Sequence, residues 1–113
     1  MAKKRNPLNL NGLQLRTLTL LQLLARLPEH GTEAKEGGIM VSNLPAPHGD
    51  HFHVGDFAVA ARDATGLGNA AVFIALERKG LIRSLYPMGA VLSAAALDYD
   101  TGLAGEILHG THA

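Results

Sequence analysis

The stretch that decides the fold runs from Thr65 to Ser84 and reads TGLGNAAVFIALERKGLIRS. It opens with a glycine-containing break and continues into a run of apolar and helix-forming residues. This pattern predicts a helix from Gly68 or Asn69 to Lys79. Gly80 is expected to stop the helix, in the position where helices commonly take a left-handed residue.

The residues after this helix predict a hairpin and a last short helix. Leu81 to Leu85 is the first strand, and Ala90 to Ser93 returns as its partner. The connection Tyr86-Pro87-Met88-Gly89 is predicted to be a tight turn, with proline in the favoured second position and glycine in the fourth. A further helix is expected near Leu103 to Leu108.

The clearest helix of the sequence lies upstream, from Leu13 to Leu27. Its leucines recur along one stripe of a helix, which is the pattern of an element that packs on a core. Asn9 or Asn11 is expected to cap its start, and the proline that follows it ends it. Leu15 and Leu23 fall outside the stripe, so part of this helix is expected to face a second subunit.

Between these two regions the sequence predicts a wide-looped hairpin followed by a short helix. Residues 29–38 are polar and contain glycine, which is typical of a loop. Ile39 to Val41 and Phe52 to Val54 are the two strands, joined by a long connection that holds two prolines. Asp56 is then expected to cap a helix from Phe57 to Ala64.

The segment from Leu76 to Ile82, LERKGLI, resembles the end of the recognition helix in winged-helix transcription regulators of the MarR type. The resemblance covers roughly residues 52–97. It implies an α+β fold, a winged helix-turn-helix with a β-hairpin wing and an extra long hairpin loop before the second helix. We expect a single domain of this kind over residues 9–113, preceded by a flexible basic arm at residues 1–8.

The resemblance also implies DNA binding, because the second helix of a helix-turn-helix shows its first residues to base edges in the major groove. The candidate DNA-contacting residues are Arg62, Thr65, Asn69, Arg78, Lys79 and Arg83. The four basic residues among them form a modest basic patch or, alternatively, a solvated helix end and strand surface. The helix departs from the family pattern in one respect, since Ala70 to Leu76 is entirely apolar. A helix that is apolar around its circumference is buried on more than one side. This favours a homodimer or a protein partner over a recognition helix that is exposed to contact DNA bases.

The composition predicts a folded, cytoplasmic protein. Its 113 residues suit one domain, 47% of them are hydrophobic, and 10 basic residues balance 10 acidic ones. A net charge of zero gives no whole-molecule attraction to DNA phosphates. The absence of cysteine excludes disulfides and thiolate metal sites. The apolar runs are far shorter than the ~20 residues of a membrane span, so no membrane partner is expected.

The strongest chemical signal is the segment PHGDHFHV, in which three of the six histidines and one carboxylate lie within six residues. His51 and His53 alternate across Phe52, so in a strand they point to one face, as two ligands of one ion must. His48 or Asp50 can reach back to the same ion from the preceding turn. Imidazole and carboxylate ligands suit zinc, nickel, iron or copper, which predicts a divalent transition metal as the cofactor.

The same cluster also fits a structural or pH-sensitive strand surface without a metal. If it does hold a metal, three ligands leave one position open. Water, a substrate or a fourth ligand such as His30 or His109 can take that position.

Three functions follow from these readings. The first is a dimeric regulator that binds duplex DNA and responds to a metal held by the histidine cluster. The second is a winged-helix module that contacts protein without DNA. The third is a metal-dependent enzyme built on the loop from His48 to His53. No nucleophile elbow, phosphate loop or dinucleotide fingerprint in the sequence points to another enzyme class.

Overall fold

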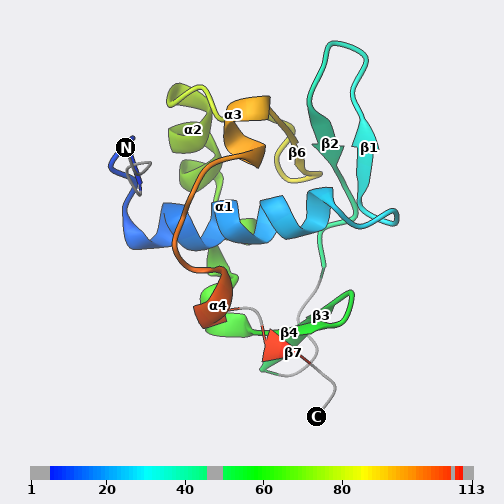
Figure 1. Cartoon of the computed structure of the whole chain (residues 1–113), viewed down its shortest axis with the longest axis vertical. Helices are drawn as coiled ribbons and strands as arrows, with labels where there is room; N and C mark the ends of the chain where they lie inside the picture. Colours follow the sequence, from blue (N-terminus) through cyan, green and yellow to red (C-terminus); the bar gives the residue numbers. More distant parts are fainter. Residues whose placement is uncertain (1–5, 46–49, 108, 111–113) are drawn as a thin grey trace.

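The chain is a mixed α+β protein with antiparallel sheets. Its computed structural model describes residues 6–45, 50–107 and 109–110 (Figure 1). The helices are α1 (Gly12–Ala25), η1 (Ala61–Asp63), η2 (Thr65–Gly68), α2 (Ala70–Arg78), α3 (Ala94–Leu97) and α4 (Ala104–Ile107), where η marks a short 3₁₀ helix. The strands are β1 (Gly31–Glu33), β2 (Ile39–Val41), β3 (His51–Val54), β4 (Phe57–Ala60), β5 (Ile82–Ser84), β6 (Ala90–Leu92) and β7 (His109–Gly110).

Helix α1 runs through the middle of the molecule. Figure 1 shows α2, α3, β1, β2 and β6 on one side of it and β3, β4, β7 and α4 on the other. A capping box starts the helix: Gln14 N donates to Asn11 Oδ1 at 2.8 Å, and Asn11 N donates to Gln14 Oε1 at 3.0 Å. The predicted helix and its asparagine cap are therefore confirmed. None of the described helices has the length and apolar character needed to cross a membrane.

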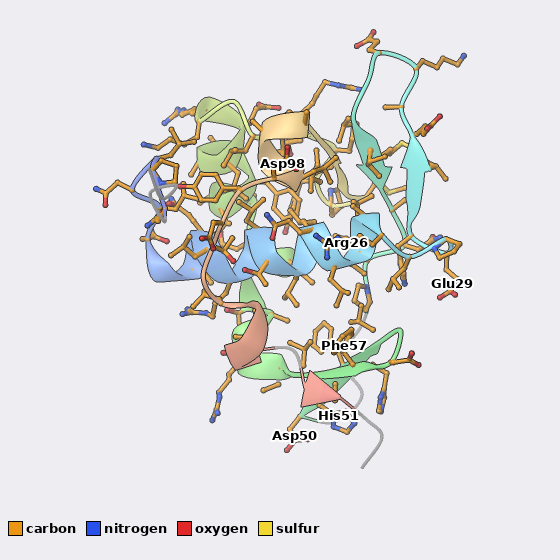
Figure 2. All side chains as sticks on the ribbon, viewed as in Figure 1. Arg26, Glu29, Asp50, His51, Phe57 and Asp98 are labelled. Carbon is orange, nitrogen blue, oxygen red and sulfur yellow. The ribbon has the colours of Figure 1, made fainter. Side chains whose placement is uncertain are left out.

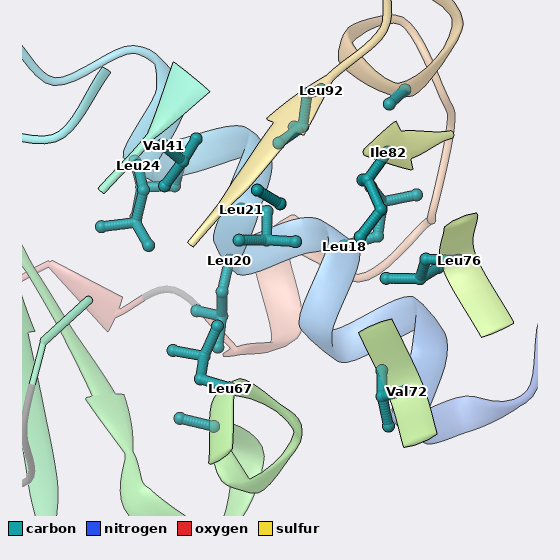
Figure 3. Close-up of a cluster of buried hydrophobic side chains, with 14 of the residues drawn as sticks. Leu18, Leu20, Leu21, Leu24, Val41, Leu67, Val72, Leu76, Ile82 and Leu92 are labelled. Atoms are coloured by element: carbon teal, nitrogen blue, oxygen red, sulfur yellow. The ribbon is translucent and has the colours of Figure 1, made fainter. Parts of the chain in front are cut away.

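The leucines of α1 pack against both halves of the chain. Figure 3 shows Leu18 among side chains of α2 and β5, and Leu20 on the side of Leu67 in η2. Leu23 is only 9% exposed, and Leu15 packs against the same core. Part of this helix was expected to face a second subunit because these two leucines fall outside the stripe, but Leu23 is buried within the described chain itself.

The larger sheet has four antiparallel strands in the order β1-β2-β6-β5. The predicted strand at residues 39–41 and the hairpin of β5 and β6 are confirmed. The structure corrects the loop expected at residues 29–38, because Gly31–Glu33 pairs with Ile39–Val41 as strand β1. All three residues of β6 are buried. This central strand joins the β1–β2 hairpin to β5.

Helix α2 is confirmed, with the predicted end residues Asn69 and Lys79 as its N-cap and C-cap. Asn69 caps it by accepting from Ala71 N at 3.0 Å, and Gly80 takes a left-handed φ of 77° after its end. The predicted turn after β5 is also present, but it begins one residue earlier. Met88 N donates to Leu85 O at 2.8 Å, which puts Pro87 in the third position of the turn, after a cis peptide bond.

The smaller sheet, of order β3-β4-β7, corrects two predictions. β2 and β3 do not form one wide-looped hairpin, because β1 and β6 occupy both edges of β2. The segment after Asp56 is strand β4 and not the start of a helix through Ala64. Gly55 and Asp56 are the two loop residues of a tight hairpin, Gly55 with a φ of 58°, and Val54 pairs directly with Phe57.

Candidate functional site

The first candidate surface is the solvent side of α2. Its core side carries Val72, Phe73 and Leu76, of which none is more than 5% exposed. The opposite stripe is open and consists of Ala70, Ala71, Ile74, Glu77 and Arg78. Ile74 is 49% exposed although it is a large aliphatic residue. The helix is thus buried on one side by the described chain. The first part of its exposed side, Ala70, Ala71 and Ile74, is apolar.

The turn between β5 and β6 extends this surface. Tyr86 Oη donates to Gly68 O at 2.9 Å, and its ring meets the buried Phe73 ring with 5.1 Å between the centroids. These contacts hold the turn against the start of α2 and leave Met88 72% exposed. We call the set that results the α2 surface: Ala70, Ala71, Ile74, Tyr86 and Met88.

A shallow pocket of about 500 Å³ adjoins the α2 surface. Tyr86 and Pro87 line one wall, and Thr65, Leu67 and Gly68 line another. Most of this lining is apolar.

Three of the predicted DNA-contacting residues lie before α2. Arg62 is exposed in η1, and Thr65 is exposed at the start of η2. Asn69 already uses its side-chain oxygen to cap α2. The basic side chain of this group is therefore Arg62 alone.

The other three predicted DNA-contacting residues lie at the far end of α2. Arg78, Lys79 and Arg83 are all exposed. Lys79 Nζ donates to Leu8 O at 3.3 Å, which brings the N-terminal segment to this end; Lys3, Lys4 and Arg5 lie outside the described residues. A helix of 9 residues is about 13 Å long, so the six residues form two groups and not one patch.

The second candidate site is the histidine pair on β3. Phe52 is 6% exposed, whereas His51 is half-buried and His53 is exposed, so the predicted alternation along the strand is confirmed. The Nε2 atoms of the two histidines lie 3.0 Å apart, and their rings are nearly perpendicular. Figure 2 shows Asp50 and His51 on the side of the sheet away from α1 and Phe57 on the side toward it.

Asp50 contacts the other nitrogen of the first histidine. Its Oδ1 lies 3.1 Å from His51 Nδ1, and this hydrogen bond holds the pKa of the Asp50 carboxyl below its usual value. His48, the remaining predicted ligand, lies outside the described residues. Among the residues that the structure does describe, no group of three or more histidine, aspartate or glutamate side chains is placed to hold a metal.

Strand β7 brings another histidine into register with this pair. His53 pairs with Ala58 on β4, and Ala58 pairs on its other edge with His109 on β7. The three residues form one cross-strand row with the alanine in the middle. His30, the other distant ligand considered from the sequence, lies with Nδ1 3.2 Å from Ser42 O beside the four-stranded sheet.

Sequence reasoning missed two parts of these sites. A helical wheel puts Ile74 opposite Val72 and Leu76, so its exposure had a readable signal. The cross-strand row of His53, Ala58 and His109 had no such signal in the sequence, because it depends on strand pairing at both edges of β4.

No known protein family, curated protein or solved structure matches this chain. Its function must therefore be argued from its own residues.

Proposed function

We propose that the chain is a protein-interaction module of the winged-helix type, which pairs with a second copy of itself through the α2 surface. The order α1, β2, α2, β5, β6, with β6 between β2 and β5 in the sheet, supports the winged-helix assignment. One departure stands beside it. The β3–β4 hairpin and the short helices η1 and η2 occupy the stretch that a winged helix gives to its second helix.

The observation that carries the proposal is the exposed stripe centred on Ile74. Ala70 and Ala71 precede it by four and three residues, and Glu77 and Arg78 follow it by three and four. Residues at these spacings lie on one face of a helix. A two-fold contact requires a surface that is complementary to itself. An antiparallel crossing of two α2 helices at Ile74 meets this requirement, because the small alanines of one copy face the long side chains of the other.

The charges around the stripe also suit pairing of two copies. The chain has no net charge, so two copies do not repel each other as whole molecules. Glu77 and Arg78 have opposite signs, and Ser84 N donates to Glu77 Oε2 at 2.7 Å, which fixes the acidic group. Tyrosine, methionine and arginine are enriched in protein interfaces, and the α2 surface with its edge offers Tyr86, Met88 and Arg78.

Sedimentation analysis of the full chain over a range of concentrations tests this proposal. We expect a concentration-dependent dimer, which Ile74→Glu converts to a monomer by setting two carboxylates against each other at the axis. Thr32→Glu on β1 is the matched control, because it adds the same charge at an exposed position away from α2 and leaves the dimer intact. A monomeric wild type, or a dimer that survives Ile74→Glu, would overturn the proposal.

A second candidate, a DNA-binding regulator, is favoured by the cluster of Arg78, Lys79 and Arg83. Phosphate contacts of this kind act on any sequence and weaken steeply with salt. The interaction module is expected not to bind random duplex DNA even at low salt. Binding that disappears as salt is added, and that Lys79→Ala weakens for all sequences alike, would support the regulator instead.

A further inference from the structure

We propose that Met88 is an oxidation site at which a peroxide dissociates the dimer formed through the α2 surface. This oxidation switch rests on the proposed function and adds a means of regulating it. Conversion of the Met88 thioether to a sulfoxide puts a polar group into an apolar contact, and the oxidised chain then stays a monomer. The dimer can exist without this sensitivity, so the pairing and the switch fail by different results.

Methionine is the only sulfur-containing residue type in the chain. The sequence has no cysteine and three methionines, at positions 1, 40 and 88. Met1 lies outside the described residues. Met40 is half-buried in β2, between two strands that pair with it, whereas Met88 is 72% exposed. Because a thioether reacts with an oxidant only where the oxidant reaches it, Met88 should be oxidised before Met40.

The backbone on both sides of Met88 is held in place without help from its side chain. Met88 N donates to Leu85 O at 2.8 Å, and Leu85 N donates to Gly89 O at 2.9 Å. Gly89 has a φ of 155°, and a Cβ there would overlap the carbonyl oxygen of Val41, so the end of the turn lies directly on β2. Oxidation of the exposed thioether should therefore leave the turn in place. Its effect falls on the contact with the second copy and not on the fold.

The oxidation is a two-electron transfer of one oxygen atom from hydrogen peroxide to the sulfur. The lone pair of Met88 Sδ attacks one peroxide oxygen, so that an S–O bond forms as the O–O bond breaks. The second oxygen leaves as hydroxide and takes the proton of the transferred oxygen, which gives the sulfoxide and one water molecule. A sulfoxide reductase supplied with a dithiol reverses the change, because the oxygen leaves as water while the dithiol is oxidised to a disulfide.

The sulfoxide is unfavourable in the dimer because the α2 surface has no side-chain donor to spare for it. The two alanines and Ile74 carry no polar side-chain atom. Tyr86 carries the one hydroxyl of the α2 surface, and its Oη already donates to Gly68 O at 2.9 Å. A sulfoxide oxygen buried among these side chains loses its water and gains no partner, which is costly. In the monomer the same oxygen stays hydrated, because Met88 is exposed.

Pairing and oxidation of Met88 oppose each other. The dimer covers Met88, so the peroxide attacks the monomer, and the oxidised monomer pairs poorly. Anything that binds one form of a chain protects that form by mass action. Oxidation of Met88 should therefore slow as the chain concentration rises, whereas Met40, which lies off the α2 surface, should keep one rate. A methionine that is merely exposed would show no such dependence on concentration.

Treatment of the full chain with hydrogen peroxide tests the switch, with peptide mapping by mass spectrometry for oxidation and sedimentation for association. We expect one oxygen on Met88 to raise the dimer dissociation constant by about tenfold or more, since each copy then buries an unpaired acceptor. A sulfoxide reductase should restore the original value. Met88→Leu removes the reactive sulfur, so peroxide should not change the dissociation constant of this variant, whatever its value. Met40→Leu is the matched control and should associate and respond to peroxide as the wild type does.

The results that contradict the pairing differ from those that contradict the switch. A wild type that is monomeric before oxidation would overturn the pairing, and the switch with it. A dimer that persists when Met88 is fully oxidised would overturn the switch alone. An equal response to peroxide in Met88→Leu, or oxidation of Met88 at one rate over all concentrations, would also overturn it. Far-UV circular dichroism follows the fold, and unfolding on oxidation would contradict an effect confined to the contact.

Discussion

The strands on the two sides of α1 differ in how completely they are buried. On one side, β6 is buried along its whole length between β2 and β5, and α2 packs its core face beside them. On the other side, β3 buries every second residue and turns His51 and His53 outward. The difference teaches that packing on the first side supports the fold, whereas the second side presents two histidines on the outer face of a strand.

The largest effect on stability is expected from Phe73→Ala, which removes a buried ring between α2 and the core. Phe73 is fully buried, so the loss of its ring should lower the free energy of unfolding by about 3–5 kcal/mol. Its neighbour Ile74 is the control, because Ile74→Ala at the half-exposed position should change stability by no more than about 0.5 kcal/mol at concentrations where the chain is monomeric. Chemical denaturation measures both. Equal effects of the two substitutions would mean that the described faces of α2 are wrong.

The next effect is expected where η2 meets α1. A Cβ on Gly66 would overlap the hydroxyl of Thr17, so Gly66→Ala should cost about 1–3 kcal/mol by forcing η2 away from α1. Gly68→Ala in the same short helix is the matched control, because a Cβ there meets no described atom within 4 Å. Thermal unfolding of the two variants compares them directly. A Gly66→Ala protein as stable as Gly68→Ala would contradict the close approach.

A smaller effect is expected from Tyr86→Phe. The substitution removes the hydrogen bond from Tyr86 to Gly68 and keeps the ring on Phe73, so it should cost about 0.5–1.5 kcal/mol. Met88→Leu, at a residue of the same turn that is 72% exposed, should stay close to the wild type. If Tyr86→Phe is also neutral, the turn is not held against α2 by this bond.

The smallest effect is expected from His53→Ala in the absence of metal. Because His53 is exposed, its removal should change stability by no more than about 0.5 kcal/mol. Denaturation in the presence of a chelator measures it. A loss of 2 kcal/mol or more would assign the histidine pair to the structure and erase the contrast between the two sides.

Local sequence signals were enough to predict the two main helices, α1 and α2. Asn11 and Asn69 cap the two main helices as expected, and Gly80 ends α2 where the pattern of leucine, charges and glycine indicates. These features depend on neighbours within a few residues. For that reason the pattern of a single sequence contains them.

The β3–β4 hairpin, strand β1 and the pairing of β7 depend on contacts that no local sequence pattern encodes. Asp56 is typical of a helix cap, but the preceding Gly55 made a two-residue hairpin with it, and strand pairing prevailed. The sequence pattern did not predict β1, because this edge strand lies in a polar, glycine-containing stretch and edge strands need few apolar residues. At the site, the period of two predicted that His51 and His53 share a face, whereas the row to His109 requires knowledge of both edges of β4.

The central claim is that the α2 surface pairs two copies of the chain, whereas β3 and β4 on the other side of α1 take no part in the pairing. Hydrogen exchange of the full chain, resolved by segment and followed at one concentration that favours the dimer and one that favours the monomer, tests it most directly. The account predicts slower exchange in α2 and in the turn after β5 at the higher concentration, with β3 and β4 unchanged. No change in α2, or slower exchange confined to β3 and β4, would contradict it.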